Sequence, residues 1–452
     1  MNRIRSLFSV LVIVCCWATA AIPAAAQDQE KKGPALVDGR AKAEVVERIG
    51  RLLADNYIFP EKAGEMKSLL DRKLNDGGYD SITLAAVLAR TLTRDLQSVS
   101  GDRHLRVVYD PDQVGSIRAS HSRSPEEREK QRLEILENER LANYGFQRLE
   151  ILEGNIGYLD LRFFSGFRQA GETAAAAMAF LSSADAVIID LRQNGGGHPE
   201  MIQIICSYFL DGNTHLNSFE YRGQEVMRQF WTLPYTPGPT MFSIPLYILT
   251  SRRTFSAAEE FCYDLKCLKR ATLVGETTGG GAHPGGFHIV NDDFLIWVSS
   301  GRAVNPVTKT NWEGTGIEPD VAVGQEKALD KARALALEKL MAEADSADRK
   351  ALLQWALDGL TAEISPASVD EAVLRRYVGR FQQGRTLFKD GRLWAVTGGR
   401  EFPLIPVSES YFIIDGVPNV RIEFVLSDDG KGLNMISRFR DGRQETTPLE
   451  RD

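Results

Sequence analysis

The stretch IPLYILTSRRTFSAAEEFCYDL, Ile244–Leu265, decides the fold expected for this chain. An apolar run over Ile244–Thr250 predicts a buried strand, and the good helix formers of Ala257–Leu265 predict a helix directly after it. Ser256 therefore lies between a core strand and the first turn of a helix. Backbone N–H groups in that turn have no helical partner, and the helix dipole favours negative charge there.

Two roles for Ser256 fit this position. Serine is among the preferred residues for capping a helix N-terminus. The same position also suits an oxygen nucleophile and the oxyanion that it creates. The segment by itself favours the cap, so the choice depends on the rest of the chain.

The composition is that of a globular protein with several domains. A length of 452 residues suggests about three domains, and 43% hydrophobic with 25% charged residues is ordinary for folded chains. The net charge of -7 argues against a general nucleic-acid or anionic-membrane surface.

The N-terminus has the pattern of a secretory signal. Arg3 and Arg5 precede the apolar run Leu7–Ala21, and Ala24–Ala26 offers small residues for cleavage. The apolar run is shorter than the roughly 20 residues that span a bilayer. We therefore expect a signal peptide over residues 1–26 and a periplasmic protein, with a retained anchor as the alternative.

Three cysteines follow that segment: Cys206, Cys262 and Cys267. Their number does not suggest a disulfide framework. A helix that runs through Cys267 would hold Cys262 and Cys267 too far apart to bridge, beyond the ~7 Å limit between Cα atoms. We expect all three to be small buried residues.

Hydrophobic periodicity divides the remainder into four parts. Residues 36–100 have helical spacing and predict a small helical domain. Residues 101–324 alternate between strands and helices, which predicts an α/β core. Residues 325–365 are helical again and form a connector. Residues 366–452 contain short strand-like runs separated by glycines, which predicts an antiparallel β barrel or sandwich.

A second motif is DLRQNGGGHPE, Asp190–Glu200, where an apolar strand ends and three glycines follow. Glycines allow positive φ and a close approach of backbone N–H groups to a ligand. A phosphate loop is disfavoured because GxGxxG is absent and no Gly-Lys-Ser/Thr follows. A strand-end turn with free amides can instead bind an oxyanion, although a plain tight turn fits too.

Two further motifs contain a candidate base and a candidate acid. GDRHL, Gly101–Leu105, contains His104, one of six histidines in the chain. NWEGTGIEPDV, Asn311–Val321, contains Glu313 and Glu318 between glycines. Taken singly, a lone histidine or a loop carboxylate is more often structural or solvated than catalytic.

Together the motifs DLRQNGGG, TFSAAEEF, VGETTGG and GTGIEPD resemble the tail-specific, or carboxy-terminal-processing, serine peptidase family. They are most similar to its branch without an inserted PDZ domain, which includes the tricorn core protease and interphotoreceptor retinoid-binding protein. The resemblance covers roughly residues 40–325. It implies a crotonase-like or Clp-protease-like ββα core within an α/β fold, without a cofactor.

The resemblance also implies site residues. Ser256 would be the nucleophile, and the amides of Gly196 and Ala257 would bind the oxyanion, with Gly197 as an alternative to Gly196. The PDZ-containing branch takes its base from a lysine in a Gly-Lys-Gly phrase, but Gly280 stands at that position here.

The other branch takes its base from an early histidine, which matches His104, and its acid from the carboxylate that matches Glu313. The tricorn pattern has a hydroxyl residue before that histidine, where this chain has Arg103, so Asp102 is a second candidate for orienting His104. The rival bases are His198, His283 and His288; we expect His283 to be a substrate-side or structural residue. The absence of HExxH and of zinc-type cysteine spacing predicts no metal site.

The expected function is that of a secreted serine endopeptidase acting on peptides or unfolded protein, with no nucleic-acid partner and no membrane span after signal cleavage. The alternative is a non-catalytic protein that binds a hydrophobic ligand or a peptide on the same fold. A third possibility is that the β domain at 366–452 docks a partner.

Overall fold

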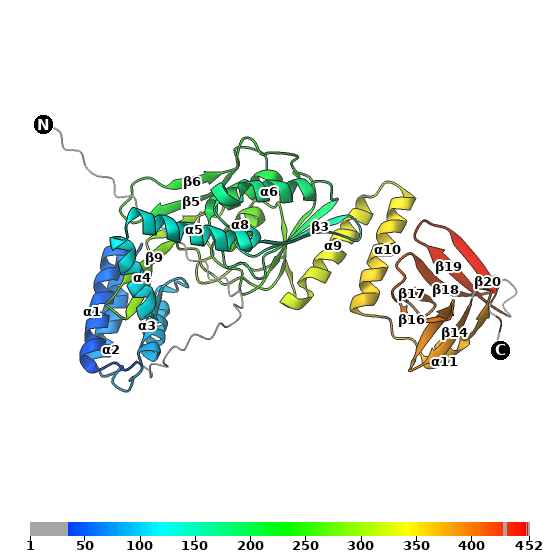
Figure 1. Cartoon of the computed structure of the whole chain (residues 1–452), viewed down its shortest axis with the longest axis horizontal. Coiled ribbons are helices and arrows are strands. Elements are labelled where there is room, and N and C mark those ends of the chain that lie inside the picture. Colours follow the sequence, from blue (N-terminus) through cyan, green and yellow to red (C-terminus); the bar gives the residue numbers. More distant parts are fainter. Residues whose placement is uncertain (1–34, 383, 428–431, 449, 451–452) are drawn as a thin grey trace. The chain divides into compact units, whose positions relative to one another are not determined.

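The computed structural model describes residues 35–450 apart from 383, 428–431 and 449 (Figure 1). The expected signal peptide, residues 1–26, lies outside the described residues. The chain divides into two compact units, and each is described here by itself. Unit 1 comprises Met1–Glu150 and Gly157–Ala328, and unit 2 comprises Ile151–Ile156 and Leu329–Asp452. The predicted α/β class, with N-terminal helices and a C-terminal antiparallel β region, is confirmed.

A six-stranded sheet forms the centre of unit 1, in the order β12-β8-β7-β4-β3-β2. The pairs β12–β8, β8–β7 and β7–β4 are parallel. Every residue of β3, β4 and β7 is buried, as expected for strands covered on both faces. The strands are β2 Phe146–Leu152, β3 Ile156–Leu161, β4 Ala186–Asp190, β7 Leu246–Thr250, β8 Thr272–Gly275 and β12 Val321–Ala322.

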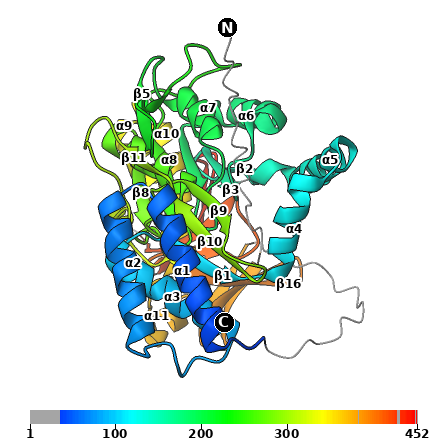
Figure 2. The ribbon, with the colours of Figure 1, turned by 90° about the vertical axis from the view of Figure 1, so that its left-hand side faces the viewer.

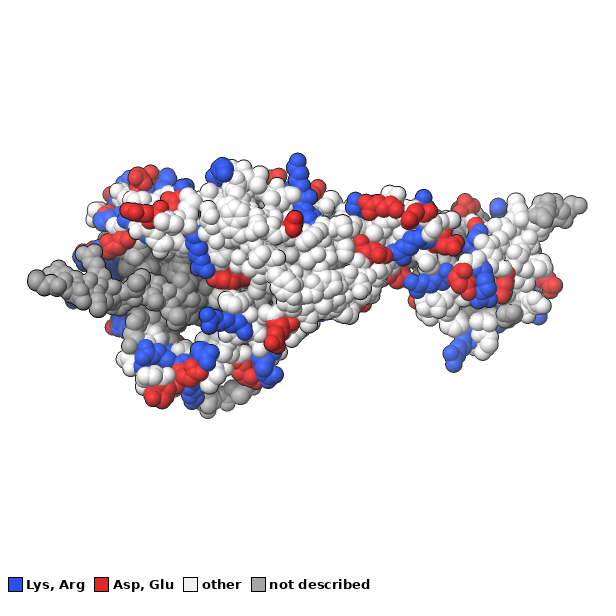
Figure 3. Space-filling model, turned by 90° about the horizontal axis from the view of Figure 1, so that it is seen from above, with Lys and Arg blue, Asp and Glu red and all other residues white. Residues whose placement is uncertain are grey.

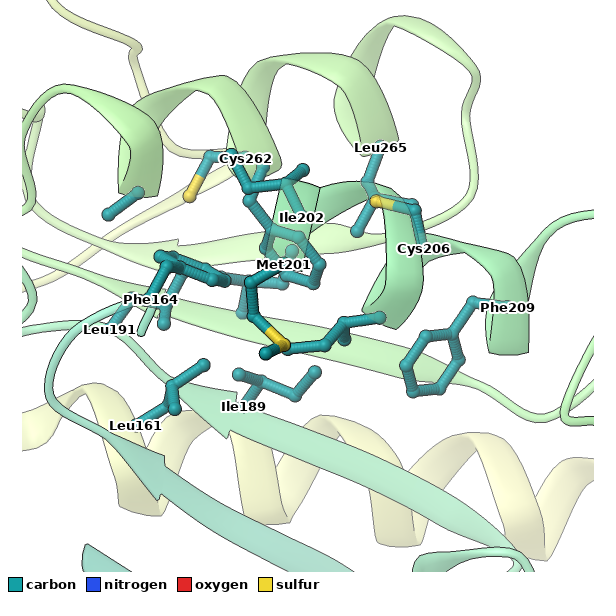
Figure 4. Packing of buried hydrophobic residues seen from close by; sticks show 14 of the residues in the cluster. Leu161, Phe164, Ile189, Leu191, Met201, Ile202, Cys206, Phe209, Cys262 and Leu265 are labelled. Carbon is teal, nitrogen blue, oxygen red and sulfur yellow. The ribbon is translucent and has the colours of Figure 1, made fainter. Parts of the chain in front are cut away.

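Three helices share the hydrophobic core with this sheet: α6 Phe167–Leu181, α7 Pro199–Phe209 and α8 Ala257–Cys267. Figure 4 shows side chains of α7 and α8, among them Met201 and Cys262, in one cluster with Leu161 and Ile189 of the strands. All three cysteines are unbridged, and Cys206 and Cys262 are buried.

The N-terminal helices pack on a second, three-stranded antiparallel sheet, β1-β10-β9, with which they share a core (Figure 2). The expected hairpin near 287–298 is present as β9 and β10. The segment Gly101–Leu105 joins α3 to β1, so both elements fix it. These elements are α1 Gly39–Asn56, α2 Pro60–Asn75, α3 Ala85–Ser100, β1 Arg106–Tyr109, β9 Gly285–Ile289 and β10 Phe294–Ser299.

The rest of unit 1 includes helical segments and a third sheet, whose residues Leu216, Phe219, Phe230 and Ala303 belong to the core of the central sheet. The charged stretch near 121–140 forms α5, a helix without a buried residue, as expected of a solvated helix. The third sheet has the order β11-β5-β6. These elements are α4 Pro111–Ser122, α5 Pro125–Leu141, η1 Asn143–Gly145, β5 His215–Tyr221, β6 Arg228–Trp231, β11 Gly301–Val304 and η2 Gln325–Lys327.

Unit 2 contains an eight-stranded antiparallel sheet whose strands follow one another in chain order. A bridge between Arg380 and Glu450 joins its first strand to the end of the chain, so the sheet closes on itself around Phe412 and Phe424. Its helices are α9 Ala328–Glu343, α10 Ala347–Ile364 and α11 Glu371–Arg376. Its strands are β13 Gly379–Phe381, β14 Gly384–Lys389, β15 Arg392–Thr397, β16 Arg400–Pro406, β17 Tyr411–Ile414, β18 Val420–Leu426, β19 Leu433–Phe439 and β20 Gln444–Pro448.

Acidic and basic side chains are interspersed on the face shown in Figure 3. Within the described ranges, every helix is too short or too polar to cross a membrane.

Candidate active site

The site lies where two neighbouring parallel strands end. The loop after β4 contains Gly195–Gly197, and the loop after β7 contains Ser256. Ligands of open α/β sheets bind at this carboxyl edge. The two loops are in contact, because a Cβ atom built on Gly196 would lie 2.9 Å from the Ser256 Cβ and 3.0 Å from the Ala257 nitrogen.

Ser256 has a strained backbone. Its φ of 54° and ψ of -122° are unusual for a residue with a side chain. Such strain persists only where surrounding contacts determine it, and it concentrates at functional sites. A serine on a strained strand-to-helix turn is typical of a nucleophile whose hydroxyl must be presented at the sheet edge. Ser256 is correspondingly only half-buried.

Glu259 ties this turn to the loop that follows β8. Its fully buried carboxylate accepts N–H bonds from Ser256 (2.9 Å), Gly280 (2.7 Å) and Gly281 (2.8 Å), and the Thr278 hydroxyl at 2.5 Å. Burial raises the pKa of Glu259 to about 7, and the four donors oppose that rise. Glu259 was not predicted as a site residue. Its position three residues after Ser256, the spacing of a capping box, could have indicated it.

Gly280 occupies the position at which the PDZ-containing branch has its lysine. It has a φ of +86°, and a Cβ there would lie 2.9 Å from the Gly316 nitrogen and 3.2 Å from the Gly314 carbonyl carbon. The loop Gly314–Gly316 therefore leaves no room for a side chain at position 280. A lysine base cannot occupy this position in the described conformation.

We expect Gly280→Ala to lower the free energy of unfolding by about 2 kcal/mol and to slow any reaction of Ser256. The added Cβ is both strained and in contact with backbone that cannot yield cheaply. Gly286→Ala on β9 is the matched control, because nothing lies within 4 Å of its Cβ position. Urea denaturation of the two variants measures the difference, and equal stabilities would contradict this account.

The candidate oxyanion donors differ in their partners. The Gly196 N–H donates to the Asn194 side-chain carbonyl at 2.8 Å, so the expected donor is already engaged. Among the described residues, no acceptor takes the N–H of Gly197 or that of Ala257, the first residue of α8. Of the two candidates, Gly196 is therefore the one in contact with the Ser256 turn, whereas Gly197 is the one whose N–H is unengaged within the described residues.

His104 lies beside the residue that precedes the serine. Its buried ring is 4.6 Å from the Phe255 ring and 6.1 Å from the Trp297 ring, between centroids. Burial lowers the pKa of His104 to about 4, so the imidazole is neutral at pH 7, the form that a general base needs. Over the described part of the chain, no hydrogen bond joins His104 to the Ser256 hydroxyl.

Glu313 fastens the segment of His104 to the loop after β8. Its Oε1 accepts the Arg103 N–H at 2.7 Å, and its Oε2 accepts the N–H groups of Ala282 (2.5 Å) and His283 (2.9 Å). Burial raises the pKa of Glu313, and the charge of Asp102 raises it further. One side-chain atom each of Asp102, His104 and Glu313 lie within 4.8 Å of one another, so the two carboxylates and the imidazole form one cluster.

Asp102 and His283 complete the cluster. Asp102 Oδ1 accepts the N–H groups of His104 (2.9 Å) and Leu105 (3.1 Å). His283 Nδ1 lies 3.6 Å from Asp102 Oδ2 and 3.6 Å from Glu313 Oε2. Burial would raise the pKa of Asp102, but His283 and His104 outweigh it, and that pKa is lowered.

The other rival bases lie outside this cluster. His198 precedes α7 and is half-buried, and His288 is on β9, where it pairs with Ile296. His283, for which a substrate-side or structural role is expected, lies in contact range of both carboxylates. Only the chain's three-dimensional course brings it there, because 179 positions separate residues 104 and 283.

Two further buried carboxyl groups of α8, Glu260 and Asp264, were also not anticipated. Burial raises the pKa of Glu260 to about 8, a rise that Asn217 partly offsets. Burial and the charge of Glu260 raise the pKa of Asp264, whose Oδ1 accepts Asn305 Nδ2 at 3.2 Å. Because these groups bind protons more tightly in the folded chain than in the unfolded chain, low pH stabilises the folded state.

Stability is therefore expected to fall between pH 5 and pH 8, the window between the ordinary and the raised pKa of Glu260. Glu260→Gln should flatten that dependence by up to ~1.4 kcal/mol per pH unit, since one titrating group is removed. Urea denaturation at several pH values measures the slope. The exposed Glu172→Gln is the control. An unchanged slope in Glu260→Gln would exclude this group as its source.

Comparison with known proteins assigns the chain to a family. Residues 155–323 match peptidase family S41, and residues 36–153 match the N-terminal domain of peptidase S41 in eukaryotic IRBP. The chain belongs to peptidase family S41. The predicted resemblance is thereby confirmed, and this is a family of serine-type peptidases.

Individual relatives are distant. The chain is 31% identical over 173 residues to carboxyl-terminal-processing peptidase 2, chloroplastic, of Arabidopsis thaliana, and 26% identical over 178 residues to peptidase 1. These matches cover 36% and 39% of this chain but only 31% and 35% of the relatives' own lengths. The solved photosystem II D1 C-terminal processing protease is 16% identical, with a TM-score of 0.41 over 63% of this chain and 93% of that one.

Proposed function

We propose that this S41 member is an exported serine endopeptidase that hydrolyses bonds in peptides or unfolded protein through an acyl-enzyme on Ser256. The observation that supports it best is the strained turn of Ser256 beside the free N–H of Ala257. Neither feature is needed for a simple helix cap. Export is inferred from residues 1–26, and a mature N-terminus at Gln27, read by N-terminal sequencing, would test it.

In the proposed mechanism, His104 is the general base. The Ser256 oxygen attacks the carbonyl carbon of the substrate while His104 takes its proton. The N–H groups of Ala257 and Gly197 bind the resulting oxyanion, a contribution of ~3 kcal/mol per donor. His104 then protonates the leaving amine, and water, deprotonated by His104, hydrolyses the acyl-enzyme.

Glu313 has a supporting role in this proposal. Its oxygens are occupied by three backbone N–H groups, so it fixes the segment that contains His104. Its negative charge, within 4.8 Å of the histidine, also favours the imidazolium that forms during the reaction.

The test is covalent labelling of the mature protein by a fluorophosphonate probe beside Ser256→Ala. The wild type should be labelled with one probe per chain and the variant should not react, because only an activated serine attacks phosphorus. Labelling of neither protein, together with saturable binding of an apolar ligand, would instead support the carrier function. Labelling of both would place the nucleophile elsewhere.

A further inference from the structure

Two buried carboxylates lie close together behind His104. Asp102 is fully buried, the Glu313 side chain is 8% exposed, and oxygens of the two are within 4.8 Å of each other. Like charges at that distance in a buried site repel strongly unless a positive charge lies between them. Such a pair would also hold a proton tightly on any neighbouring imidazole.

One side chain is placed to cancel this charge. His283 Nδ1 is 3.6 Å from Asp102 and 3.6 Å from Glu313, and no other ion pair to either carboxylate is found among the described residues. The backbone N–H of His283 also donates to Glu313, which fixes the backbone position from which the ring extends. Its ring packs edge-on against Phe59 at 5.6 Å, so it has little freedom to turn away.

We propose that His283 is a positively charged positioning residue that offsets the negative charge of one of the two carboxylates. His104 is then neutral in the resting protein, and the remaining negative charge stabilises it once it is protonated. This rests on the proposed function in taking His104 as the base. With His283 charged, the three groups sum to one negative charge. With a neutral residue at 283, Asp102 and Glu313 would leave two negative charges, and His104 would stay protonated in the resting protein.

The charged and titratable surroundings are consistent with this role. His104 faces Asp102, Arg106 and His283; after burial itself, Arg106 and His283 both lower the pKa of His104. The phenol of Tyr57, from the end of α1, faces Asp102 and Glu313, and burial beside them raises its pKa, so it stays uncharged. Among the described residues, the negative charges paired with His283 are therefore those of Asp102 and Glu313.

The first test measures the pH dependence of fluorophosphonate labelling in a set of matched variants. In His283→Gln the acid limb of the rate profile should move up by about one pH unit, with little loss at pH 8. Asp102→Asn keeps an acceptor for the N–H groups of His104 and Leu105. In this variant the acid limb of the rate profile should not move up. His288→Gln, outside the cluster, is the control.

The double variant Asp102→Asn/His283→Gln distinguishes an electrostatic role of His283 from a purely structural one. It restores a net charge of one negative unit through Glu313, so its acid limb should return to within ~0.5 unit of the wild type. A purely structural role predicts instead a uniform loss of rate at every pH and additive damage in the double variant. Either result would overturn the proposal.

A second measurement does not depend on activity. Nitrogen NMR of the full chain with labelled histidine and Ser256→Ala should show a doubly protonated ring at His283 and a neutral ring at His104 at pH 7, with assignments from the variants. A neutral His283 would overturn the charge assignment even if labelling succeeds. A charged His283 in a protein that no probe labels would leave the charge assignment standing and reject the peptidase.

Discussion

Replacing His104 with alanine is expected to slow fluorophosphonate labelling of Ser256 by about 10³-fold or more. The serine hydroxyl is a weak nucleophile at neutral pH and needs a neighbouring base. His104 is neutral at pH 7 because burial lowers its pKa, and its ring packs on Phe255, next to the serine. Second-order labelling rates for the two proteins measure the effect.

The control and the contrary outcomes are specific. His288→Ala removes another imidazole of unit 1 from a strand outside the cluster and should leave the labelling rate within a few-fold. Added imidazole should partly restore His104→Ala, because the buried space between Phe255 and Trp297 can admit it. A folded His104→Ala that labels within tenfold of the wild type would remove His104 as the base.

Sequence patterns predicted the elements of unit 1 well, because its signals are local. The uninterrupted apolar runs at Val187–Ile189 and Leu246–Leu249 correspond to buried parallel strands, and the glycines after Asp190 mark the loop that meets Ser256. Family resemblance added the residues to consider, but not their contacts.

What the sequence could not provide was pairing between distant segments. The hydrogen bond from the Gly196 N–H to Asn194 is not of this kind: it is a local Asx turn, which the asparagine two residues earlier could have indicated. His283 meets Asp102 only because β1 and β9 flank β10 in one sheet. The charge interactions within such a cluster cannot be predicted from the spacing of a motif, which describes residues on one segment.

The second large effect is expected at Glu259. Its carboxylate is an acceptor for Ser256, Thr278, Gly280 and Gly281 at once, so it joins the strained serine turn to the loop after β8. Glu259→Gln keeps one oxygen but turns an NH₂ group toward backbone N–H donors. Two buried donors then lose their acceptor, at about 1–3 kcal/mol each.

We therefore expect Glu259→Gln to lower the free energy of unfolding by about 3 kcal/mol and to slow labelling of Ser256 by about 10²-fold. The loss of rate follows because Ser256 and the adjoining Ala257 amide are held by that carboxylate, and small displacements of reacting groups cost that much. Urea denaturation and labelling rates measure the two effects separately.

The neighbouring residue provides the matched comparison. Glu260 is also buried on α8, but its Oε1 has no hydrogen-bond partner within the described chain, and burial raises its pKa to about 8. Glu260→Gln keeps one side-chain oxygen as an acceptor for Asn217, so it should cost less than ~1 kcal/mol at pH 5 and stabilise the chain at pH 8. Burial alone would predict equal losses at both positions. Opposite outcomes at adjacent glutamates would show that the serine turn depends on the hydrogen bonds to Glu259, whereas similar losses would reject that conclusion.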